Sequence, residues 1–239
     1  MMRKVRADLH LHTCLSPCAD AQMQATAIVR QAKKIGLDMI GISDHNSAEN
    51  VAAVVKAGAR EGLPVIAGME ITSSEEVHIL GLFNTEQDLM DMQEIVYRNL
   101  PGENHEQAYG PQEVVDEWDN VVGTNSRLLL GATTMTVERV VEAIHDRSGV
   151  AIASHIDRER FSLIGQLGFI PKGLNLDAVE VSRPSSMKQE YDYPVVTFSD
   201  AHFLEDIGNN STEFMIEDVS VDEIRKALHN EMGRRIVFN

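Results

Sequence analysis

The sequence predicts an α/β fold in which about seven strands alternate with helices around a parallel sheet. Short apolar runs recur along the 239 residues, and most are followed by a stretch whose apolar residues repeat every three to four positions. His, Asp and Glu residues stand at the ends of many of these runs. Because carboxyl strand ends converge on one mouth in a barrel but spread along an edge in an open sheet, this distribution favours a barrel.

The individual elements follow from these patterns. The expected strands are the apolar runs at residues 5–9, 39–42, 65–67, 77–83, 150–153, 178–181, 195–198 and 214–216, and the apolar residues 236–238 close the chain. The expected helices cover residues 25–34, 48–60, 85–99, 136–146, 161–167 and 221–231. Thr85, Thr136 and Ser220 precede three of them, and each offers a side-chain oxygen that can accept from a free N–H of the first turn.

Residues 101–130 interrupt the alternation and are acidic and polar. One hairpin is expected there, from Val114 to Val122. A long irregular connection inside a compact domain is usually functional or mobile. We therefore interpret residues 1–239 as a single domain and this segment as an insertion that could serve as a lid.

The formal net charge is −16, from 37 acidic and 21 basic residues. Proteins that bind nucleic acid nonspecifically show the reverse balance, so long duplex nucleic acid is not an expected partner. Bound cations would offset the charge locally, which leaves a small phosphorylated substrate compatible with it. No apolar run approaches the roughly 20 residues that span a bilayer. The N-terminus lacks the apolar stretch of a signal peptide, so we expect a cytoplasmic protein with no membrane partner.

Imidazole and carboxylate groups dominate the strand ends. His10 and His12 share one face of the first strand, because residues two apart on a strand point the same way. The full candidate set is His10, His12, Asp20, His45, Glu70, His78, His155, Asp200 and His202. His78 lies within a strand, where a hydrogen-bonded core histidine is the alternative. Cys14 and Cys18 are expected as free thiols or as a thiol near metal.

This set is too large for one tetrahedral zinc. Nitrogen and oxygen donors suit Zn, Mn or Fe, and a carboxylate such as Glu70 can bridge two of these ions. Two or three divalent ions held in this way would activate a bridging water or hydroxide. The chemistry predicted is hydrolysis of a charged ester.

The motifs resemble those of the PHP (polymerase and histidinol phosphatase) family. They are Asp8-Leu9-His10-Leu11-His12-Thr13, Ser43-Asp44-His45-Asn46, Gly68-Met69-Glu70, His78, Ser154-His155 and Ser199-Asp200-Ala201-His202. The resemblance implies a distorted (β/α)7 TIM-like barrel with a metal site at its C-terminal mouth, and phosphoesterase activity.

The resemblance also implies a ligand set for each metal. The three sets are His10, His12, Glu70 and Asp200 for the first, Glu70, His78 and His155 for the second, and His45, His202 and a residue of the first loop for the third. That loop departs from the family pattern, and Asp20 is our choice for its ligand, with Cys18 as the rival. Asp44 is expected to orient an imidazole.

Arginine suits the non-bridging oxygens of a phosphate because its planar fork donates two hydrogen bonds. Arg158, Arg160 and Arg183 follow two expected strands, and we rank Arg158 and Arg183 first. Tyr109 or Trp118 in the insertion could stack on a base or ring.

The leading function is hydrolysis of a small phosphomonoester, such as histidinol phosphate or a nucleotide phosphate. One alternative is a phosphodiesterase or exonuclease on short oligonucleotides. Another is a non-catalytic metal-binding module that acts with a partner protein. Metal-dependent amide hydrolysis is disfavoured, since no lysine stands at a matching strand end.

Overall fold

The computed structural model describes residues 1–183 and 191–237. Its strands are β1 (Arg3–Leu11), β2 (Met39–Ile42), β3 (Val65–Thr72), β4 (His78–Phe83), β5 (Glu113–Val115), β6 (Val121–Thr124), β7 (Val150–Ala153), β8 (Ala178–Glu180), β9 (Val195–Val196), β10 (Thr212–Ile216) and β11 (Arg235–Val237). The helices are α1 (Ala25–Lys34), α2 (Val51–Glu61), α3 (Glu86–Asn99), α4 (Glu106–Tyr109), α5 (Val137–His145), α6 (Leu163–Leu167) and α7 (Val221–Leu228), with a 3-10 turn η2 (Leu204–Asp206). Helix α1 and strands β2 and β7 have the bounds predicted from the sequence.

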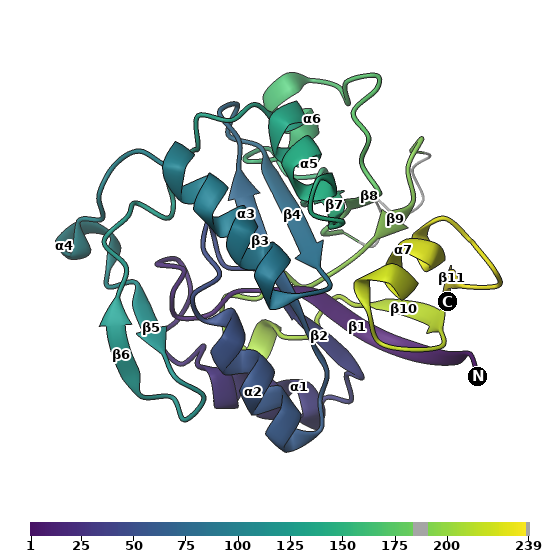
Figure 1. Cartoon of the computed structure of the whole chain (residues 1–239), viewed down its shortest axis with the longest axis horizontal. Helices are drawn as coiled ribbons and strands as arrows, with labels where there is room; N and C mark the ends of the chain where they lie inside the picture. Colours follow the sequence, from purple (N-terminus) through teal and green to yellow (C-terminus); the bar gives the residue numbers. More distant parts are fainter. Residues whose placement is uncertain (184–190, 238–239) are drawn as a thin grey trace.

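Nine strands form one curved sheet in the order β11-β10-β1-β2-β3-β4-β7-β8-β9 (Figure 1). The segment after β9 returns to β1 and nearly closes the barrel. His12 N donates to Ala201 O at 3.0 Å, and Ser199 N donates to the buried carboxylate of Asp8 at 3.0 Å. The predicted barrel is therefore confirmed. Its wall consists of strands β1, β2, β3, β4, β7, β8 and β9.

The expectation of a wholly parallel sheet is wrong at β10, which runs antiparallel to β1 and β11. It is also wrong at β4, which runs antiparallel to both β3 and β7. Only five residues, 73–77, join β3 to β4. A connection this short can close a hairpin but cannot cross over to a parallel neighbour. The N-terminal end of β4 therefore lies at the mouth where the parallel strands end, and this end carries His78.

The barrel interior below the mouth is filled with apolar side chains, including Leu9, Leu82, Phe198 and Phe214, and the apolar stripe of α7 packs with them. A second apolar layer joins the outside of the barrel to α1, α2, α3 and α5. The pairing of β1 with β2 shifts register between Asp8 and Leu11. Such a shift changes which side chains face a given side. It lets β1 contribute Leu9 to the apolar interior and His10 to the polar mouth.

The three predicted N-caps are confirmed: Thr85, Thr136 and Ser220 each accept from the backbone N–H three residues on. Residues 101–130 contain α4 and the hairpin β5–β6, which projects beside α2 in Figure 1. Asp119 of the hairpin accepts from Thr26 N at the start of α1. The hairpin thus packs against the α1–α2 side of the barrel.

Candidate metal centre

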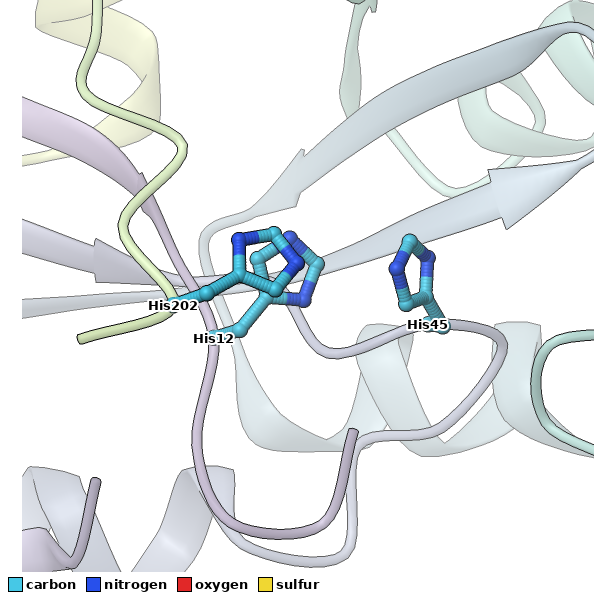
Figure 2. A group of neighbouring side chains, drawn as sticks. All are labelled: His12, His45 and His202. Carbon is cyan, nitrogen blue, oxygen red and sulfur yellow. The ribbon is translucent and has the colours of Figure 1, made fainter. Parts of the chain in front are cut away.

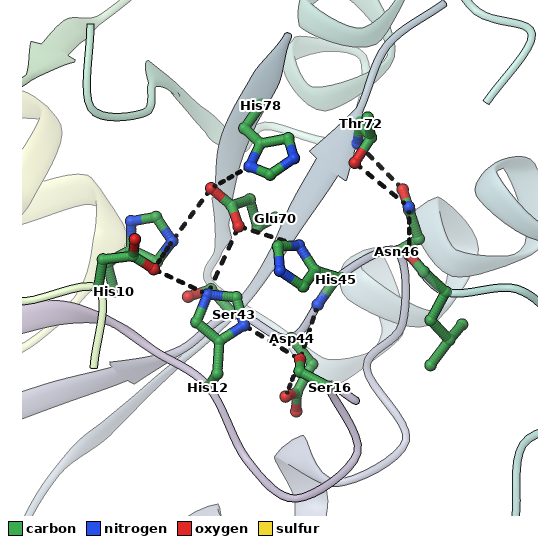
Figure 3. A network of polar contacts seen from close by, with 12 residues as sticks. His10, His12, Ser16, Ser43, Asp44, His45, Asn46, Glu70, Thr72 and His78 are labelled. Carbon is green, nitrogen blue, oxygen red and sulfur yellow. Dashed lines mark hydrogen bonds and ion pairs between the residues drawn. The ribbon is translucent and has the colours of Figure 1, made fainter. Parts of the chain in front are cut away.

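Glu70, near the end of β3, is completely buried at the centre of the barrel mouth. His10, His12, His45 and His78 lie around it (Figure 3). Its Oε1 lies 3.2 Å from His10 Nε2 and 3.1 Å from His78 Nδ1. Its Oε2 lies 3.1 Å from His45 Nδ1. His155 Nε2 is 3.3 Å from Oε1. Histidine nitrogens therefore lie near both oxygens of one carboxylate. This is the arrangement that a carboxylate bridging two metal ions needs.

A second group consists of His12, His45 and His202 (Figure 2). The ring centroid of His12 lies 4.2 Å from that of His202 and 4.5 Å from that of His45. Asp200, two residues before His202, places Oδ1 3.1 Å from His12 Nε2. Asp200 and His202, two positions apart in the sequence, thus both contribute side chains to the cluster.

Supporting side chains fix two of these imidazoles. His10 Nδ1 lies 2.7 Å from Glu180 Oε2, with both groups fully buried. His12 Nδ1 lies 3.0 Å from Ser16 Oγ, and Ser16 Oγ donates to Asp44 at 2.7 Å. Asp44 therefore orients His12 through Ser16. In both cases Nδ1 is held by this partner and Nε2 faces the cluster, as in metal-ligating histidines.

The backbone is left-handed at three positions around the cluster. The φ angles are 50° at Asn46, 32° at His155 and 51° at Asp200. Such angles are uncommon for residues other than glycine and cluster at functional sites, where the surrounding structure holds them in place. Asn46 is held by its amide, which donates to Leu129 O and Gly131 O.

The donor chemistry fits divalent ions. Among the described residues, His10 Nε2, His45 Nδ1, His78 Nδ1 and both oxygens of Glu70 are buried without a hydrogen bond of proper geometry. Buried polar atoms without partners are costly, so a set that points inward at one spot indicates a ligand. Three groups have donor atoms within 4.8 Å of one another: His10, His12, Glu70 and Asp200; His45, Glu70 and His78; and His12, His45 and His202.

Metal binding needs neutral imidazoles and ionised carboxylates. Burial opposes the charged forms of His10, His45 and His202, but acidic neighbours outweigh it and raise their pKa values, so these imidazoles must release protons when an ion binds. Burial raises the pKa of Glu70, but His78 and His10 outweigh it and hold that pKa well below its usual range. Burial lowers the pKa of His78 to about 4, although Glu70 opposes this shift. Burial together with His202 and His45 holds the pKa of His12 well below its usual range, although Asp200 opposes this.

The structure does not bring Asp20 to the cluster. Its carboxylate accepts from Gln22 N at 2.8 Å and borders a separate small hollow beside Phe203. The loop residue that reaches the histidines is Cys18, which lines the same cavity as His45 and His202. Burial raises the pKa of this thiol, but the two histidines outweigh it and lower the pKa to about 6. Of the two loop residues, the structure therefore brings Cys18, and not Asp20, to the histidines.

A cavity of about 420 Å³ opens over the cluster. Its lining includes Arg158, Arg160, Phe161 and Leu130 as well as the donor residues. Arg158 Nη1 donates to Asp200 Oδ2 at 2.5 Å, and Nε donates to Ser182 Oγ at 2.9 Å. Arg183 is exposed and is not part of this lining. Of the two arginines ranked first from the sequence, the structure therefore brings only Arg158 to the cavity, and Arg160 joins it.

A hollow of about 550 Å³ lies at the opposite end of the barrel, beside the start of β3 and the end of β4. Most side chains in its lining are apolar, and Glu86 is the charged residue among them. It is the larger of the two but brings no group of metal donors together. The chemistry therefore resides at the mouth.

Sequence reasoning missed Glu180 and Ser16. Glu180 stands inside an apolar run, and that is itself a signal, because a charged residue in a buried strand must be paired. Ser16 lies in an irregular loop, where no pattern predicts its direction.

Comparison with known proteins places these features in a family. The PHP domain model matches residues 8–166, and a PHP-associated model matches residues 185–231. A phosphoribosyl 1,2-cyclic phosphate 1,2-diphosphodiesterase from Eggerthella lenta is 30% identical over 31% of this chain and 29% of its own length. A 3',5'-nucleoside bisphosphate phosphatase from Chromobacterium violaceum is 31% identical over 31% of this chain and 26% of its own length. The chain thus spans well under half of the length of these curated relatives.

The fold is similar to that of endonuclease Q from Pyrococcus furiosus, with a TM-score of 0.76 and 22% identity over 99% of this chain and 58% of that one. A complex of endonuclease Q with a 27-mer duplex substrate carrying an abasic lesion gives a TM-score of 0.74 at 20% identity, over 98% of this chain and 58% of that one. At this identity the likeness shows the fold alone. It conflicts in part with the expectation that long duplex nucleic acid is not a partner, because a protein of this fold binds duplex DNA. In the described part of the chain, no helix combines the length and apolarity that crossing a membrane requires.

Proposed function

The chain belongs to the PHP domain family, and on this premise we propose that it is a metal-dependent phosphoesterase that hydrolyses small phosphate esters. The observation that carries the proposal is the set of buried, unpartnered donor atoms around Glu70. A stable protein does not keep so many desolvated polar atoms facing one another unless a ligand joins them.

We assign each ion the ligand set that the family resemblance implies, with Cys18 as the loop residue. His10, His12, Glu70 and Asp200 would hold the first, and their donor atoms lie within 4.8 Å of one another. Glu70, His78 and His155 would hold the second, since one nitrogen of each imidazole lies within 3.3 Å of Glu70 Oε1. His45, His202 and Cys18 hold the third. Mixed nitrogen and oxygen donors suit Zn, Mn or Fe, and the thiol adds a preference for Zn at the third position. When bound, these ions polarise the ester oxygens and lower the pKa of water.

We assign Arg158 the role of binding the phosphate group of the substrate. Its Nε and Nη1 are occupied by Ser182 and Asp200, which hold the guanidinium at the edge of the cluster. No hydrogen bond of Nη2 occurs among the described residues, so this nitrogen is available to a phosphate oxygen. A fixed guanidinium there neutralises the charge that builds up on phosphorus oxygens as the ester bond breaks.

The cavity and the charge support a small substrate. A volume of about 420 Å³ is in the range that accommodates a small molecule. The net charge of −16 opposes a long polyanion. The relatives named above act on small phosphates, one a cyclic diester and one a bisphosphate, so we leave monoester and diester open within this class.

Cleavage of DNA is the second candidate function. It is favoured by the fold of endonuclease Q, which aligns with nearly the whole of this chain. A single-stranded end or a flipped nucleotide would be the part that enters the cavity, because a stacked base pair is too large.

The test is hydrolysis of p-nitrophenyl phosphate, bis-p-nitrophenyl phosphate and a short labelled oligonucleotide by protein loaded with Mn, Zn or Fe. We expect turnover of at least one small ester by the wild type, and loss of it in His10→Ala and Asp200→Ala. Cleavage of the oligonucleotide alone would favour the nuclease. Metal binding without turnover of any of them would favour a binding module that serves a partner protein.

A further inference from the structure

Phe161 stands at the rim of the cavity, next to the metal ligands. Its ring stacks on the imidazole of His78, with the centroids 4.7 Å apart and the planes 16° from parallel. The residue is nevertheless 39% exposed, and it belongs to the cavity lining. One face of the ring therefore covers a metal ligand, and the exposed remainder borders the space where a substrate would lie.

The backbone of Phe161 is strained in this position. Phe161 has a φ of 57°, in the left-handed region that bulky side chains avoid. The strain persists because neighbouring bonds fix the loop: His78 N donates to Phe161 O at 2.9 Å, and Ser162 Oγ donates to Arg158 O at 2.5 Å. A Cβ at Gly165 would clash with the Glu159 carbonyl oxygen, so the start of α6 is also packed closely against this loop. Strain that is over-determined in this way is found where a side chain has a function.

The rest of the rim matches an aromatic ligand. Leu130, at the end of the insertion, also lines the cavity and adds a second apolar wall. The residues on either side of it, Leu129 and Gly131, each accept a hydrogen bond from the side-chain amide of Asn46 at the mouth. The lining thus combines metal-ligating groups and Arg158 with apolar surface from Phe161 and Leu130. A ligand that fills both parts carries a phosphate at one end and a flat apolar group at the other.

We propose that Phe161 forms a stacking subsite for a planar ring of the substrate, so that the site selects phosphate esters carrying a nucleobase or a similar aromatic group. This proposal rests on the proposed phosphoesterase function and narrows its substrate class. The sequence directed attention to Tyr109 and Trp118 for such a role. Neither belongs to the cavity lining, and Trp118 instead packs under the guanidinium of Arg60 at 3.9 Å.

The test compares two ligands that share a 5'-phosphate on ribose and differ in the base. Adenosine 5'-monophosphate and ribose 5-phosphate are measured as competitors of p-nitrophenyl phosphate hydrolysis by the Mn-loaded protein. Inhibition constants are informative whether or not either compound is itself cleaved. We expect the nucleotide to bind about fivefold to 100-fold more tightly, the range of base–aromatic stacking.

Two variants distinguish the effect of the aromatic ring from the effect of the backbone strain. Phe161→Leu removes the ring and keeps the strain, whereas Phe161→Gly removes both. We expect both to bring the two inhibition constants together, and Phe161→Tyr to keep them apart. Phe169→Leu is the matched control, because Phe169 is 63% exposed and lies outside the cavity lining.

The outcomes distinguish the two proposals. If no phosphate ester is hydrolysed, the proposed function fails, and calorimetric binding of the same two ligands to the Mn-loaded protein still measures the subsite. Equal affinities of the wild type for adenosine 5'-monophosphate and ribose 5-phosphate would overturn the stacking subsite. A preference for the nucleotide that survives both Phe161→Leu and Phe161→Gly would overturn it as well.

Discussion

His10 and Glu180 meet across the barrel from β1 and β8, with Nδ1 and Oε2 2.7 Å apart and both side chains completely buried. The carboxylate fixes the imidazole so that Nε2 faces Glu70 and Asp200. At this ligand, a buried ion-pairing residue determines which ring nitrogen faces the metal centre.

We expect Glu180→Gln to lower metal affinity by about 10- to 100-fold, because the amide keeps the shape but loses the charge that polarises His10. Competition with a chromophoric chelator measures this directly. Glu231→Gln, an exposed exchange of the same kind, is the control and should leave the affinity unchanged. Equal affinities in the wild type and Glu180→Gln would show that Glu180 is a structural partner only.

Cys18 should be a ligand and Asp20 should not. Co(II)-loaded protein should show a thiolate charge-transfer band that Cys18→Ser abolishes and Asp20→Asn retains. Metal should also protect Cys18 from iodoacetamide, as read by peptide mass spectrometry. Cys14 serves as an internal control, because burial raises its pKa to about 12 and keeps it unreactive. A band that survives Cys18→Ser would refute this assignment.

Arg158→Ala should lower kcat about 100-fold, the cost of removing one group that stabilises developing charge. Part of the loss would come from Asp200, which accepts from this guanidinium. Arg158→Lys should recover little, because an ammonium cannot bond Ser182 and Asp200 and still reach a phosphate. Arg183→Ala should stay within about twofold of the wild type, since solvated surface charges contribute little. A larger effect at Arg183 than at Arg158 would reverse our assignment.

Glu223 should stabilise the fold in a pH-dependent manner. Its carboxylate accepts from Arg234 Nε at 2.9 Å, Lys226 Nζ at 3.0 Å and Glu217 N at 3.0 Å. The bond from Arg234 is the main reason that its pKa is lowered to about 2. A depressed folded-state pKa gives stability that is present above pH 4.5 and is lost as the pH falls toward 2.

Glu223→Gln should therefore lower the free energy of unfolding at pH 7 by about 1 to 2 kcal/mol. The difference from the wild type should shrink between pH 4.5 and 2. Urea unfolding of the metal-free proteins at several pH values measures it, and a difference that does not change with pH would contradict the role of this carboxylate.

The sequence predicted much of the fold, because periodicity and capping residues are local signals. The bounds of α1 and the three caps are examples. The direction of β4 was not predicted, since apolar alternation is the same in both directions. The five residues between β3 and β4 carried that information, because they are too few for a crossover.

Most of the predicted donor residues meet in space because strand ends of a barrel converge whatever the loops do. Predictions that depended on loop conformation did less well. Asp20 and Cys18 are two positions apart, and only the path of the loop decides which of them faces His45. Phe161 was expected to begin a helix, whereas it precedes the Ser162 cap in a left-handed conformation.

The most direct measurement of the central claim is an anomalous difference map from crystals soaked in Mn²⁺, with data collected at the manganese edge. We predict two or three peaks at the barrel mouth, with Glu70 contacting more than one of them, and loss of at least one peak in Glu70→Gln. A map with no peak among His10, His12, His45, His78, His155 and His202 in the soaked wild type would contradict the metal centre and the phosphoesterase function built on it.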